Sequence, residues 1–362
     1  MATVQLTLPH HRYDIHVAPG GLASLGAWAH AVAPHARAAI LADANVFDRY
    51  APIAQRSLES AGYTVIARPV PPGEDHKNIA QVASLYDALI DGKLERRSPV
   101  IALGGGVIGD TVGFVAASYL RGVPFIQCPT TLLAMVDASV GGKVGVNLPR
   151  GKNLVGAFHQ PHLVVCDTDT LRTLPPRELR CGLAECVKHG IIRDAALFEW
   201  IEKNLDAIVR LDSAALVELV RWNVQIKANV VMADEKETGE RAHLNFGHTF
   251  GHAIEATSGY GHYEHGEAVA LGMVAATRLA VSSGRVGGEL LNRLVALLNR
   301  IGLPVHAPDL APTPVLIESM RLDKKVAGGR VRLVLPDRLG AVSMVGDTPD
   351  EAIAAAWDSL RK

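Results

Sequence analysis

A short apolar run leads directly into a glycine-rich turn near residue 100, and this junction constrains the fold more than any other feature of the chain. Residues 99–103 read PVIAL and residues 104–110 read GGGVIGD, so a predicted strand enters a GxGxxG pattern that opens a predicted helix. Glycines let the backbone approach a pyrophosphate closely, and a helix N-terminus presents free N–H groups to it. The junction predicts a dinucleotide-binding α/β sheet, although a glycine-rich turn packed closely on a sheet would explain the same residues without a ligand.

The surrounding segments extend this sheet and then change character. Short β-branched runs bounded by turn residues predict parallel strands at 38–42, 64–67, 100–103, 125–128 and 163–166. After about Pro176, amphipathic patterns predict long helices at 194–209, 213–232, 265–281 and 288–301, with one later strand at 330–335. Because 362 residues exceed the usual size of one hydrophobic core, we expect two domains. They are an α/β domain with a parallel, Rossmann-like nucleotide-binding sheet at 1–170 and a mainly α-helical domain at 171–362.

Charge and cysteine content exclude several classes of protein. With 36 basic and 37 acidic residues the net charge is -1, so no overall field favours nucleic acid or an anionic membrane as a partner. The four cysteines form no CxxC pair and are too few for a disulfide framework. The N-terminus lacks the pattern of a secretory signal, and glycines and Asp110 interrupt the most apolar stretch, residues 99–120. We therefore expect a cytoplasmic protein with no membrane or nucleic-acid partner.

Polar residues after two early strands are candidates for nucleotide contacts. Asp43 stands at the end of a predicted strand, where a carboxylate can accept from a ribose hydroxyl. The turn at 72–77, PGEDHK, offers Glu74 and Lys77 after the next strand. A strand-end aspartate is more often a turn former, and the second segment alone would be an ordinary loop.

A histidine-rich segment points to a metal site. His248 and His252 are spaced i, i+4, which places them on one face of a helix, and His262 and His265 follow closely. A catalytic zinc-like site uses about three protein ligands and one open position, so a carboxylate should complete the set. Glu185 stands in an otherwise apolar helical stretch, where metal coordination would offset the cost of burying the acid. The spacing does not say which histidines bind, and helical pairs of histidines also arise by chance.

The stretch at 137–153, DASVGGKVGVNLPRGKN, interleaves glycines with Lys143 and Lys152 and ends in Asn153. Ammonium and amide donors in such a loop can hold a phosphate or carboxylate and stabilise a leaving phosphate. A solvated glycine-rich turn is an equally good interpretation of this stretch alone. Further basic residues stand beside other motifs, although surface charge is the ordinary explanation for any one of them: Arg121, Lys188, Lys227, Arg241 and Lys325.

Six long segments, in this order, resemble the 3-dehydroquinate synthase family. They read GGGVIGDTVGFVAASYLRG, CPTTLLAMVDASVGGKVGVN, GKNLVGAFHQP, GLAECVKHG, LNFGHTFGHAIE and HGEAVALGM. The resemblance runs from about residue 40 to Lys325, and motifs of this length are highly specific. Cys181 stands where the family more often has a small residue such as serine. The resemblance implies a dehydroquinate synthase-like fold, NAD as cofactor, one divalent metal that is zinc or cobalt, and a homodimer.

The resemblance also assigns residues, and His252 then moves from the metal to the substrate phosphate. The implied metal ligands are Glu185, His248 and His265. The implied NAD contacts are Asp43, Glu74, Lys77, Gly105, Gly106, Asp110, Thr130, Thr131, Asp137 and Lys152. The implied substrate contacts are Arg121, Asp137, Lys143, Lys152, Asn153, Lys188, Lys227, Arg241, Asn245, His252 and Lys325. Among them, the implied catalytic residues are Lys143, Lys152, Asn153, Lys188, Arg241, Asn245 and His252.

The implied reaction converts 3-deoxy-D-arabino-heptulosonate 7-phosphate, a sugar-acid phosphate, into 3-dehydroquinate and phosphate in the shikimate pathway to aromatic amino acids. NAD transiently oxidises the C5 alcohol while the metal lowers the pKa of that alcohol, and the new ketone acidifies the C6 proton. Phosphate is then eliminated, the cofactor returns its hydride, and an intramolecular aldol reaction closes the ring. The NAD is recycled, so this enzyme is a lyase with no net redox change.

Three other functions fit parts of the sequence. A metal-dependent polyol dehydrogenase of the glycerol type shares the nucleotide and metal chemistry, but it has no need for phosphate contacts from Lys143, Lys152, Asn153 and Lys325. Another sugar-phosphate cyclase would be expected to alter positions such as Asn245, His252 and Lys325, which are retained. A non-catalytic nucleotide-binding or scaffold protein predicts loss of Glu185, His248, His265 or Lys152, and each is present.

Overall fold

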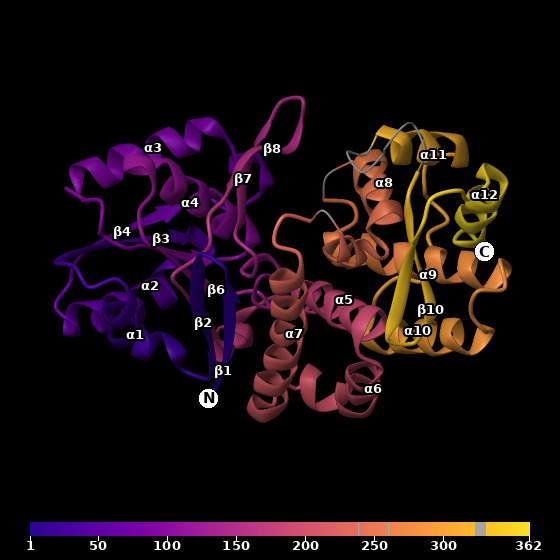
Figure 1. The fold of residues 1–362 in the computed structure, drawn as a ribbon, viewed down its shortest axis with the longest axis horizontal. Coiled ribbons are helices and arrows are strands. Elements are labelled where there is room, and N and C mark those ends of the chain that lie inside the picture. Colours follow the sequence, from indigo (N-terminus) through magenta and orange to yellow (C-terminus); the bar gives the residue numbers. More distant parts are fainter. Residues whose placement is uncertain (238, 260, 323–330) are drawn as a thin grey trace. The chain divides into compact units, whose positions relative to one another are not determined.

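The computed structural model describes residues 1–237, 239–259, 261–322 and 331–362, and the chain divides into two compact units (Figure 1). The first unit comprises Met1–Pro175 with Leu211–Glu235, and the second comprises Pro176–Arg210 with Lys236–Lys362. The segment Leu211–Glu235 therefore packs with the first unit, although the sequence places it in the helical domain. The domain boundary between residues 170 and 171 stays a prediction.

A seven-stranded sheet forms the centre of the first unit, in the order β1-β2-β9-β6-β5-β3-β4. All neighbouring pairs are parallel except β1 and β2, which form an antiparallel hairpin. The five strands expected from the sequence are confirmed, whereas the hairpin at the N-terminus was not predicted. The strands are β1 (Ala2–Leu8), β2 (His11–Ala18), β3 (Arg37–Asp43), β4 (Thr64–Val70), β5 (Val100–Gly104), β6 (Phe125–Pro129) and β9 (Leu163–Asp167).

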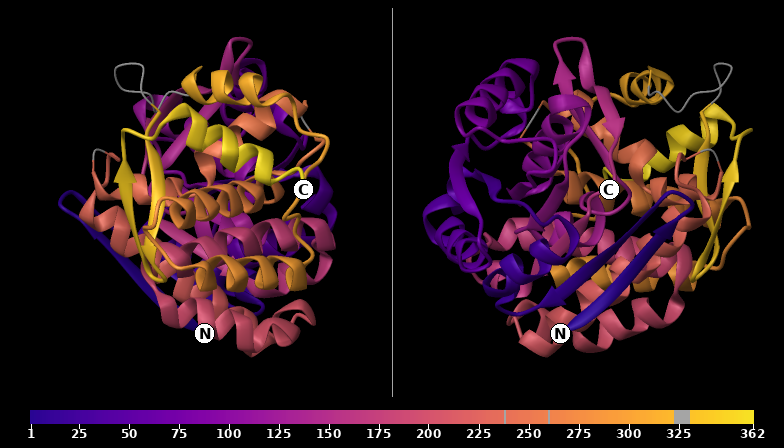
Figure 2. Two further views of the ribbon diagram at one scale, coloured as in Figure 1. Left: turned by 90° about the vertical axis from the view of Figure 1, so that its right-hand side faces the viewer. Right: turned by 60° about the vertical axis from the view of Figure 1, so that its left-hand side comes forward.

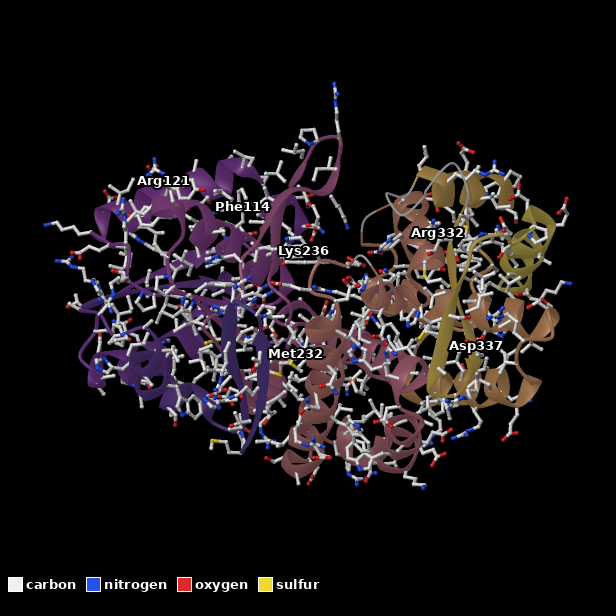
Figure 3. All side chains as sticks on the ribbon, viewed as in Figure 1. Phe114, Arg121, Met232, Lys236, Arg332 and Asp337 are labelled. Carbon is white, nitrogen blue, oxygen red and sulfur yellow. The ribbon has the colours of Figure 1, made fainter. Side chains whose placement is uncertain are left out.

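Helices cover both faces of this sheet, which is why its central strands are apolar throughout. All five residues of β5, β6 and β9 are buried, as expected for parallel strands that lack a solvent face. One buried cluster joins the sheet to α3 (Ile79–Asp91) and α4 (Gly106–Ser118). The other joins it to α1 (Leu25–Val32) and α2 (Ala44–Ser60). The helix α7 (Ser213–Ala233) packs against β1, where the Thr7 N–H donates to Met232 Sδ at 3.4 Å (Figure 3).

A second hairpin of the first unit lies outside the main sheet. It consists of β7 (Lys143–Leu148) and β8 (Gly151–Phe158), which pair antiparallel, and it packs against α4. Because the sequence here reads as a glycine-rich loop, the strands were not predicted. Short helical turns connect the remaining elements: η1 (Gly21–Ser24), η2 (Glu74–His76), η3 (Tyr119–Arg121), η4 (Ala134–Ala138, a π-turn) and η5 (Thr168–Thr173).

The second unit is built around α9 (His265–Ser282), which packs against α5, α8, α10, α12 and β10. The left view of Figure 2 shows the β10–β11 hairpin beside α9. The predicted helices of this unit are confirmed, and the late strand lies at 333–338 instead of 330–335. No helix formed by the described residues is long and apolar enough to cross a membrane. The other elements are α5 (Pro176–Arg193), α6 (Ala195–Val209), η6 (Glu240–Asn245), α8 (His248–Ser258), α10 (Gly288–Ile301), α11 (Thr313–Leu322), β10 (Leu333–Arg338), β11 (Ala341–Val345) and α12 (Asp350–Ser359).

Candidate active site

Three helices of the second unit bring Glu185, His248 and His265 together. Glu185 is in the middle of α5, whereas His248 and His265 are the first residues of α8 and α9. Glu185 Oε1 lies 3.6 Å from His248 Nε2 and 3.5 Å from His265 Nε2, so one carboxylate oxygen faces both rings. The carboxylate is fully buried, and the three ligand atoms lie within 4.8 Å of one another. This arrangement is a candidate three-ligand metal centre.

Groups around this cluster fix the orientation of both imidazoles. His248 Nδ1 lies 3.2 Å from the carbonyl oxygen of Phe246, and His265 Nδ1 lies 3.4 Å from Glu255 Oε2. A ligating histidine commonly uses its second nitrogen in this way, because that contact selects the tautomer with the free nitrogen on the metal side. Sequence reasoning missed Glu255, although it stands at the end of the segment LNFGHTFGHAIE, one turn beyond His252.

The separations within the cluster fit a divalent cation. Ligands about 2.1 Å from a tetrahedral ion are separated from one another by roughly 3.4 Å. The two oxygen–nitrogen distances, 3.5 and 3.6 Å, are close to that value. Neither oxygen of Glu185 has a hydrogen-bond partner of regular geometry among the described residues, although the Lys188 ammonium forms an ion pair with Oε2. The carboxylate can therefore present Oε1 to a cation while Lys188 neutralises the other oxygen.

Charge within the cluster shifts the pKa of each member. Burial opposes ionisation of Glu185, but Lys188 and the two histidines hold the pKa of this carboxyl well below its usual range. Burial and the nearby Lys188 ammonium lower the pKa of His248. Burial also disfavours the imidazolium of His265, but the adjacent carboxylates of Glu185 and Glu255 outweigh it and raise the pKa of His265 to about 10. Glu185 is thus ionised and His248 is neutral, whereas His265 holds a proton that a bound cation would displace, because ligating imidazoles are neutral.

Glycines at the helix crossings allow the three ligands to meet. A Cβ on Gly266 would lie 2.3 Å from the Cα of Cys181, so α9 touches the backbone of α5 one turn before Glu185. A Cβ on Gly272 would lie 2.0 Å from the carbonyl oxygen of Gly247, which places the start of α8 directly against α9. Gly247 itself has φ +79°, a conformation that favours glycine. These close approaches were not predicted, because each joins two segments that are separated in the chain.

A polar clamp holds the beginning of α9. Arg177 donates from Nε and Nη2 to the two carboxylate oxygens of Glu267, at 2.8 and 2.7 Å, and Nη2 also donates to the carbonyl oxygen of His262 at 3.0 Å. Glu267 completes a capping box with Glu264, because the Glu264 N–H donates to its carboxylate at 3.0 Å. This clamp fixes the backbone on both sides of His265.

Other predicted substrate residues of the second unit lie on the helices that carry the cluster or on the turn that precedes α8. Lys188 is buried one turn after Glu185, and the ring of His252 lies 5.5 Å from the ring of His248. Arg241 is buried in η6, and Asn245, at the end of the same turn, donates from Nδ2 to Glu237 Oε1 at 2.9 Å. Lys325 lies outside the described residues.

The predicted nucleotide residues of the first unit gather at one edge of its sheet. Asp43, Gly104 and Pro129 end the neighbouring parallel strands β3, β5 and β6, whose carboxyl ends form the usual ligand-binding edge. A Cβ on Gly104 would lie 2.9 Å from Asp43 Cβ. A Cβ on Gly105 would lie 3.3 Å from Thr131 Cγ2. The N–H of Thr130 donates to the Gly104 carbonyl oxygen at 2.9 Å. A Cβ on Gly106 would lie 3.4 Å from that of Ala138.

Several of these residues are already engaged within the first unit. Asp43 caps α2 by accepting from the Asn45 N–H at 2.8 Å, and burial raises the pKa of its carboxyl. Lys77, which is buried, forms a 2.6 Å ion pair with Asp110 in the second turn of α4. Burial raises the pKa of Asp110, although the ammonium of Lys77 opposes that shift.

The predicted anion residues of the first unit divide into three places. Asp137, in the π-turn, forms an ion pair with Lys227 of α7. Lys143, Lys152 and Asn153 all stand on the β7–β8 hairpin. Arg121 is not brought to either group, because it is exposed at the end of η3, before the amino end of β6 (Figure 3).

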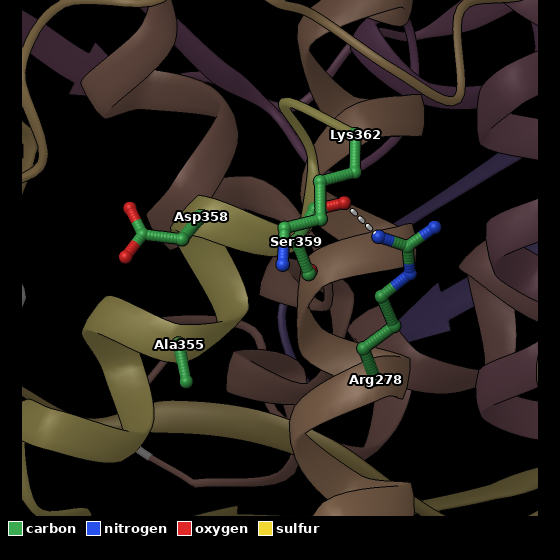
Figure 4. A pocket seen from close by; sticks show the side chains of 5 residues that line it. All are labelled: Arg278, Ala355, Asp358, Ser359 and Lys362. Atoms are coloured by element: carbon green, nitrogen blue, oxygen red, sulfur yellow. Dashed lines mark hydrogen bonds between the residues drawn. The ribbon is translucent and has the colours of Figure 1, made fainter.

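A pocket elsewhere in the second unit is not part of this site. Its volume is about 410 Å³, and Arg278 spans it by donating to the carbonyl oxygen of Ser359 (Figure 4). Arg278 follows His265 by 13 residues on α9, which corresponds to about 20 Å along the helix. The pocket is lined by Arg278, Ala355, Asp358, Ser359 and Lys362.

Comparisons with known proteins agree on one family. The family described as 3-dehydroquinate synthase N-terminal matches residues 67–181, and 3-dehydroquinate synthase C-terminal matches residues 182–326. A 3-dehydroquinate synthase of Desulforamulus reducens is 47% identical over 355 residues, which cover 98% of this chain and 99% of that protein.

Two solved structures are similar over the whole chain, each with a TM-score of 0.89 and with 98% of both chains covered. One is the 2-epi-5-epi-valiolone synthase of Streptomyces hygroscopicus subsp. jinggangensis with NAD+ and Zn2+ bound, which is 31% identical. The other is a 2-deoxy-scyllo-inosose synthase in complex with carbaglucose-6-phosphate, NAD+ and Co2+, which is 26% identical.

Proposed function

The chain belongs to the 3-dehydroquinate synthase family, and from this premise we propose that it converts 3-deoxy-D-arabino-heptulosonate 7-phosphate into 3-dehydroquinate and phosphate. The observation that carries the proposal is the buried carboxylate oxygen of Glu185, which faces the Nε2 atoms of both His248 and His265. A non-catalytic scaffold has no use for such a group, because burying a carboxylate is costly unless a counter-charge compensates it.

The cofactors supply the redox and Lewis-acid parts of this chemistry. When bound, NAD accepts and returns a hydride, and a divalent cation lowers the pKa of a substrate alcohol. We propose that Glu185, His248 and His265 hold that cation, zinc or cobalt, and that Glu255 keeps the ring of His265 in its ligating orientation. Lys188 stabilises the ionised Glu185 through Oε2, and its ammonium adds positive charge beside the reacting alcohol.

The remaining proposed residues bind and orient the substrate. Positive groups of the second unit, Lys188, Arg241 and Lys325, contact the anionic substrate, and Asn245 and His252 orient it. On the first unit, Lys143, Lys152 and Asn153 hold the phosphate group in position, where it can accept the C6 proton as it leaves. The Asp137–Lys227 pair completes the proposed substrate contacts within this chain, whereas the substrate contact of Arg121, which lies apart from both groups, rests on the family resemblance alone.

We propose that the glycine-rich edge of the first unit binds NAD. Gly105 and Gly106 let the pyrophosphate approach the start of α4, and Asp43 accepts from a ribose hydroxyl. Glu74, Lys77, Asp110, Thr130, Thr131, Asp137 and Lys152 complete the proposed contacts. Cofactor recycling follows from the reaction, because the oxidation at C5 is reversed before product is released.

We also propose that the protein is a cytoplasmic homodimer. The outer edge of β1 supports self-association: this strand of seven residues carries no charged side chain, and an uncharged edge strand readily pairs with another chain.

The four cysteines are all buried and unbridged, which fits a reducing compartment. Sedimentation analysis of the full chain and fractionation of cells test these two points.

The test of the proposed function is phosphate release from 3-deoxy-D-arabino-heptulosonate 7-phosphate by metal-loaded protein with trace NAD. We expect many phosphates released per NAD, no net NADH and 3-dehydroquinate as the product. Accumulation of NADH with glycerol would instead support the polyol dehydrogenase, and a different carbocycle would support another cyclase. Lys152→Ala should slow phosphate release, whereas Arg150→Ala, an exposed cation of the same hairpin, should not.

A further inference from the structure

Asn147 stands between two groups of proposed site residues and belongs to neither. It is in β7, and its backbone N–H donates to the carbonyl oxygen of Lys77 at 2.8 Å. Its side-chain Nδ2 donates to Glu74 Oε1 at 3.0 Å, and its Oδ1 accepts from the backbone N–H of Asn153 at 2.8 Å. One residue thus contacts the loop that carries Glu74 and Lys77 and the hairpin strand that begins beside Lys152.

These contacts use both the donor and the acceptor of the side-chain amide. The Nδ2 group is the donor to a carboxylate, and Oδ1 is the acceptor for a backbone N–H, a combination that aspartate and leucine lack. The accepting side also fixes an uncommon conformation, because Asn153 has φ +52° and side chains rarely adopt this left-handed region. The bond from the Asn153 N–H therefore holds the proposed phosphate-binding residue in a defined backbone conformation.

We propose that Asn147 couples NAD binding to the binding of the substrate phosphate group. This inference rests on the proposed function, because it takes Glu74 and Lys77 as nucleotide contacts and Lys152 and Asn153 as phosphate contacts. A ligand that immobilises the residues on one side of Asn147 also restricts those on the other side. The second ligand then costs less conformational entropy to bind, so each ligand tightens the binding of the other. Linkage requires the two effects to be equal in size.

The coupling would serve a reaction in which NAD accepts a hydride from the substrate and later returns it. Oxidised intermediate and reduced cofactor must remain together until the hydride is returned, and a phosphate group that strengthens nucleotide binding favours this. After phosphate leaves the protein, the nucleotide loop loses that support. Asn147 is a positioning residue in this account, because it acts through Glu74 and Asn153 and not on the reacting atoms.

The test is a titration of NAD into the metal-loaded full-length protein, with and without saturating inorganic phosphate. We expect phosphate to tighten NAD binding about fivefold or more in the unaltered protein, within the usual range of coupling between sites. Asn147→Asp keeps the shape and the acceptor but loses the donor and adds a negative charge beside Glu74. It should reduce the effect of phosphate to less than about twofold.

A matched control separates this role from a general loss of an amide. Asn204→Asp removes a similar half-buried donor, whose Nδ2 bonds to the carbonyl oxygen of Trp200 within α6, and it should leave the coupling unchanged. Unaltered coupling in Asn147→Asp would overturn the inference, as would an unaltered protein in which phosphate binds but leaves the affinity for NAD unchanged. Neither result would affect the proposed function, which fails only if the unaltered protein releases no phosphate from its sugar-acid substrate.

Discussion

The candidate nucleotide edge and the candidate metal centre are built in opposite ways. The nucleotide edge collects residues at the ends of adjacent parallel strands, and Cβ atoms on its Gly105 and Gly106 would contact only side chains, at 3.3 and 3.4 Å. The metal centre takes one residue from each of three helices. The space that a Cβ would occupy on its glycines, Gly266 and Gly272, already holds backbone atoms of a neighbouring segment. Glycine therefore has two roles in this protein, and substitutions should separate them: at the first place they should weaken binding, and at the second they should weaken the fold.

The largest effect is expected at the buried carboxylate of the metal centre. Glu185→Gln removes the charge that a cation needs, so we expect loss of bound zinc or cobalt and a fall in kcat of at least about a thousandfold, ~4 kcal/mol in activation free energy. Metal analysis of the purified variant and phosphate-release kinetics check this. Glu178→Gln, two turns earlier on α5, should retain metal and activity. A variant at Glu185 that keeps one tightly bound metal would contradict the assigned ligand set.

The second effect tests the close approach of α9 to α5. A methyl group at Gly266 would meet the Cys181 backbone at 2.3 Å, so Gly266→Ala should lower the free energy of unfolding by about 3 kcal/mol and weaken metal binding. Denaturant unfolding and competition with a chelator measure the two changes. Gly288→Ala is the matched control, because no atom lies within 4 Å of a Cβ there and the first turn of α10 tolerates alanine. Equal stability of the two variants would show that this crossing is not tight.

The third effect tests the other role of glycine. A Cβ on Gly105 would lie 3.3 Å from Thr131 Cγ2, and its φ of -75° suits alanine, so Gly105→Ala should keep its stability within about 1 kcal/mol. The methyl group would occupy the space proposed for the pyrophosphate, and we expect the Kd for NAD to rise about tenfold, which is 1.4 kcal/mol. Calorimetric titration with NAD and thermal unfolding check both parts. Unchanged affinity would argue that this turn only packs on the sheet.

The smallest effect distinguishes an ordinary buried histidine from the metal-ligating ones. Burial, together with nearby His11 and His159, lowers the pKa of His162 to about 4, and its Nδ1 accepts from the Phe125 N–H at 3.3 Å. The unfolded chain therefore binds more protons between about pH 6.5 and 4, so stability should fall as the pH falls through this window.

His162→Asn keeps an acceptor for the Phe125 N–H but does not titrate. Between pH 7 and 5.5, the free energy of unfolding should fall by about 1 kcal/mol more in the unaltered protein than in this variant. Urea unfolding at both pH values gives the comparison. If the two proteins lose stability equally, the pKa of His162 is not lowered in the folded state.

The two regions also differ in how far the sequence predicted them. The strand, turn and helix around Gly105 are contiguous, so local pattern was sufficient for the fold and the glycine turn. For the metal centre, spacing placed His248 and His252 on one helix face, and their rings do lie close together. Glu185 Oε1, however, faces His248 and His265, and only the family resemblance had selected His265. The reason is physical. Which residues of different helices meet depends on how the helices pack, and Gly266 and Gly272 permit this packing without making it predictable from the sequence.

The other omissions have similar causes. Residues 143–158 read as a loop because glycines dilute their strand pattern, yet cross-strand pairing makes them a hairpin. The helix at 213–233 was predicted correctly, but its association with the first unit depends on contacts such as that between Asp137 and Lys227. Asn147 lay within a segment already marked for anion binding, but its link to Glu74 joins residues 73 positions apart.

The proposed reaction requires one divalent cation, held by Glu185, His248 and His265. The most direct test of this requirement is to remove metal from the full-length protein with a chelator, then titrate in Co²⁺ while following phosphate release and the visible absorption of the ion. Activity and absorption should rise together and reach a plateau at one equivalent per chain. Full phosphate release by metal-free protein, or absorption that saturates without any return of activity, would contradict the account.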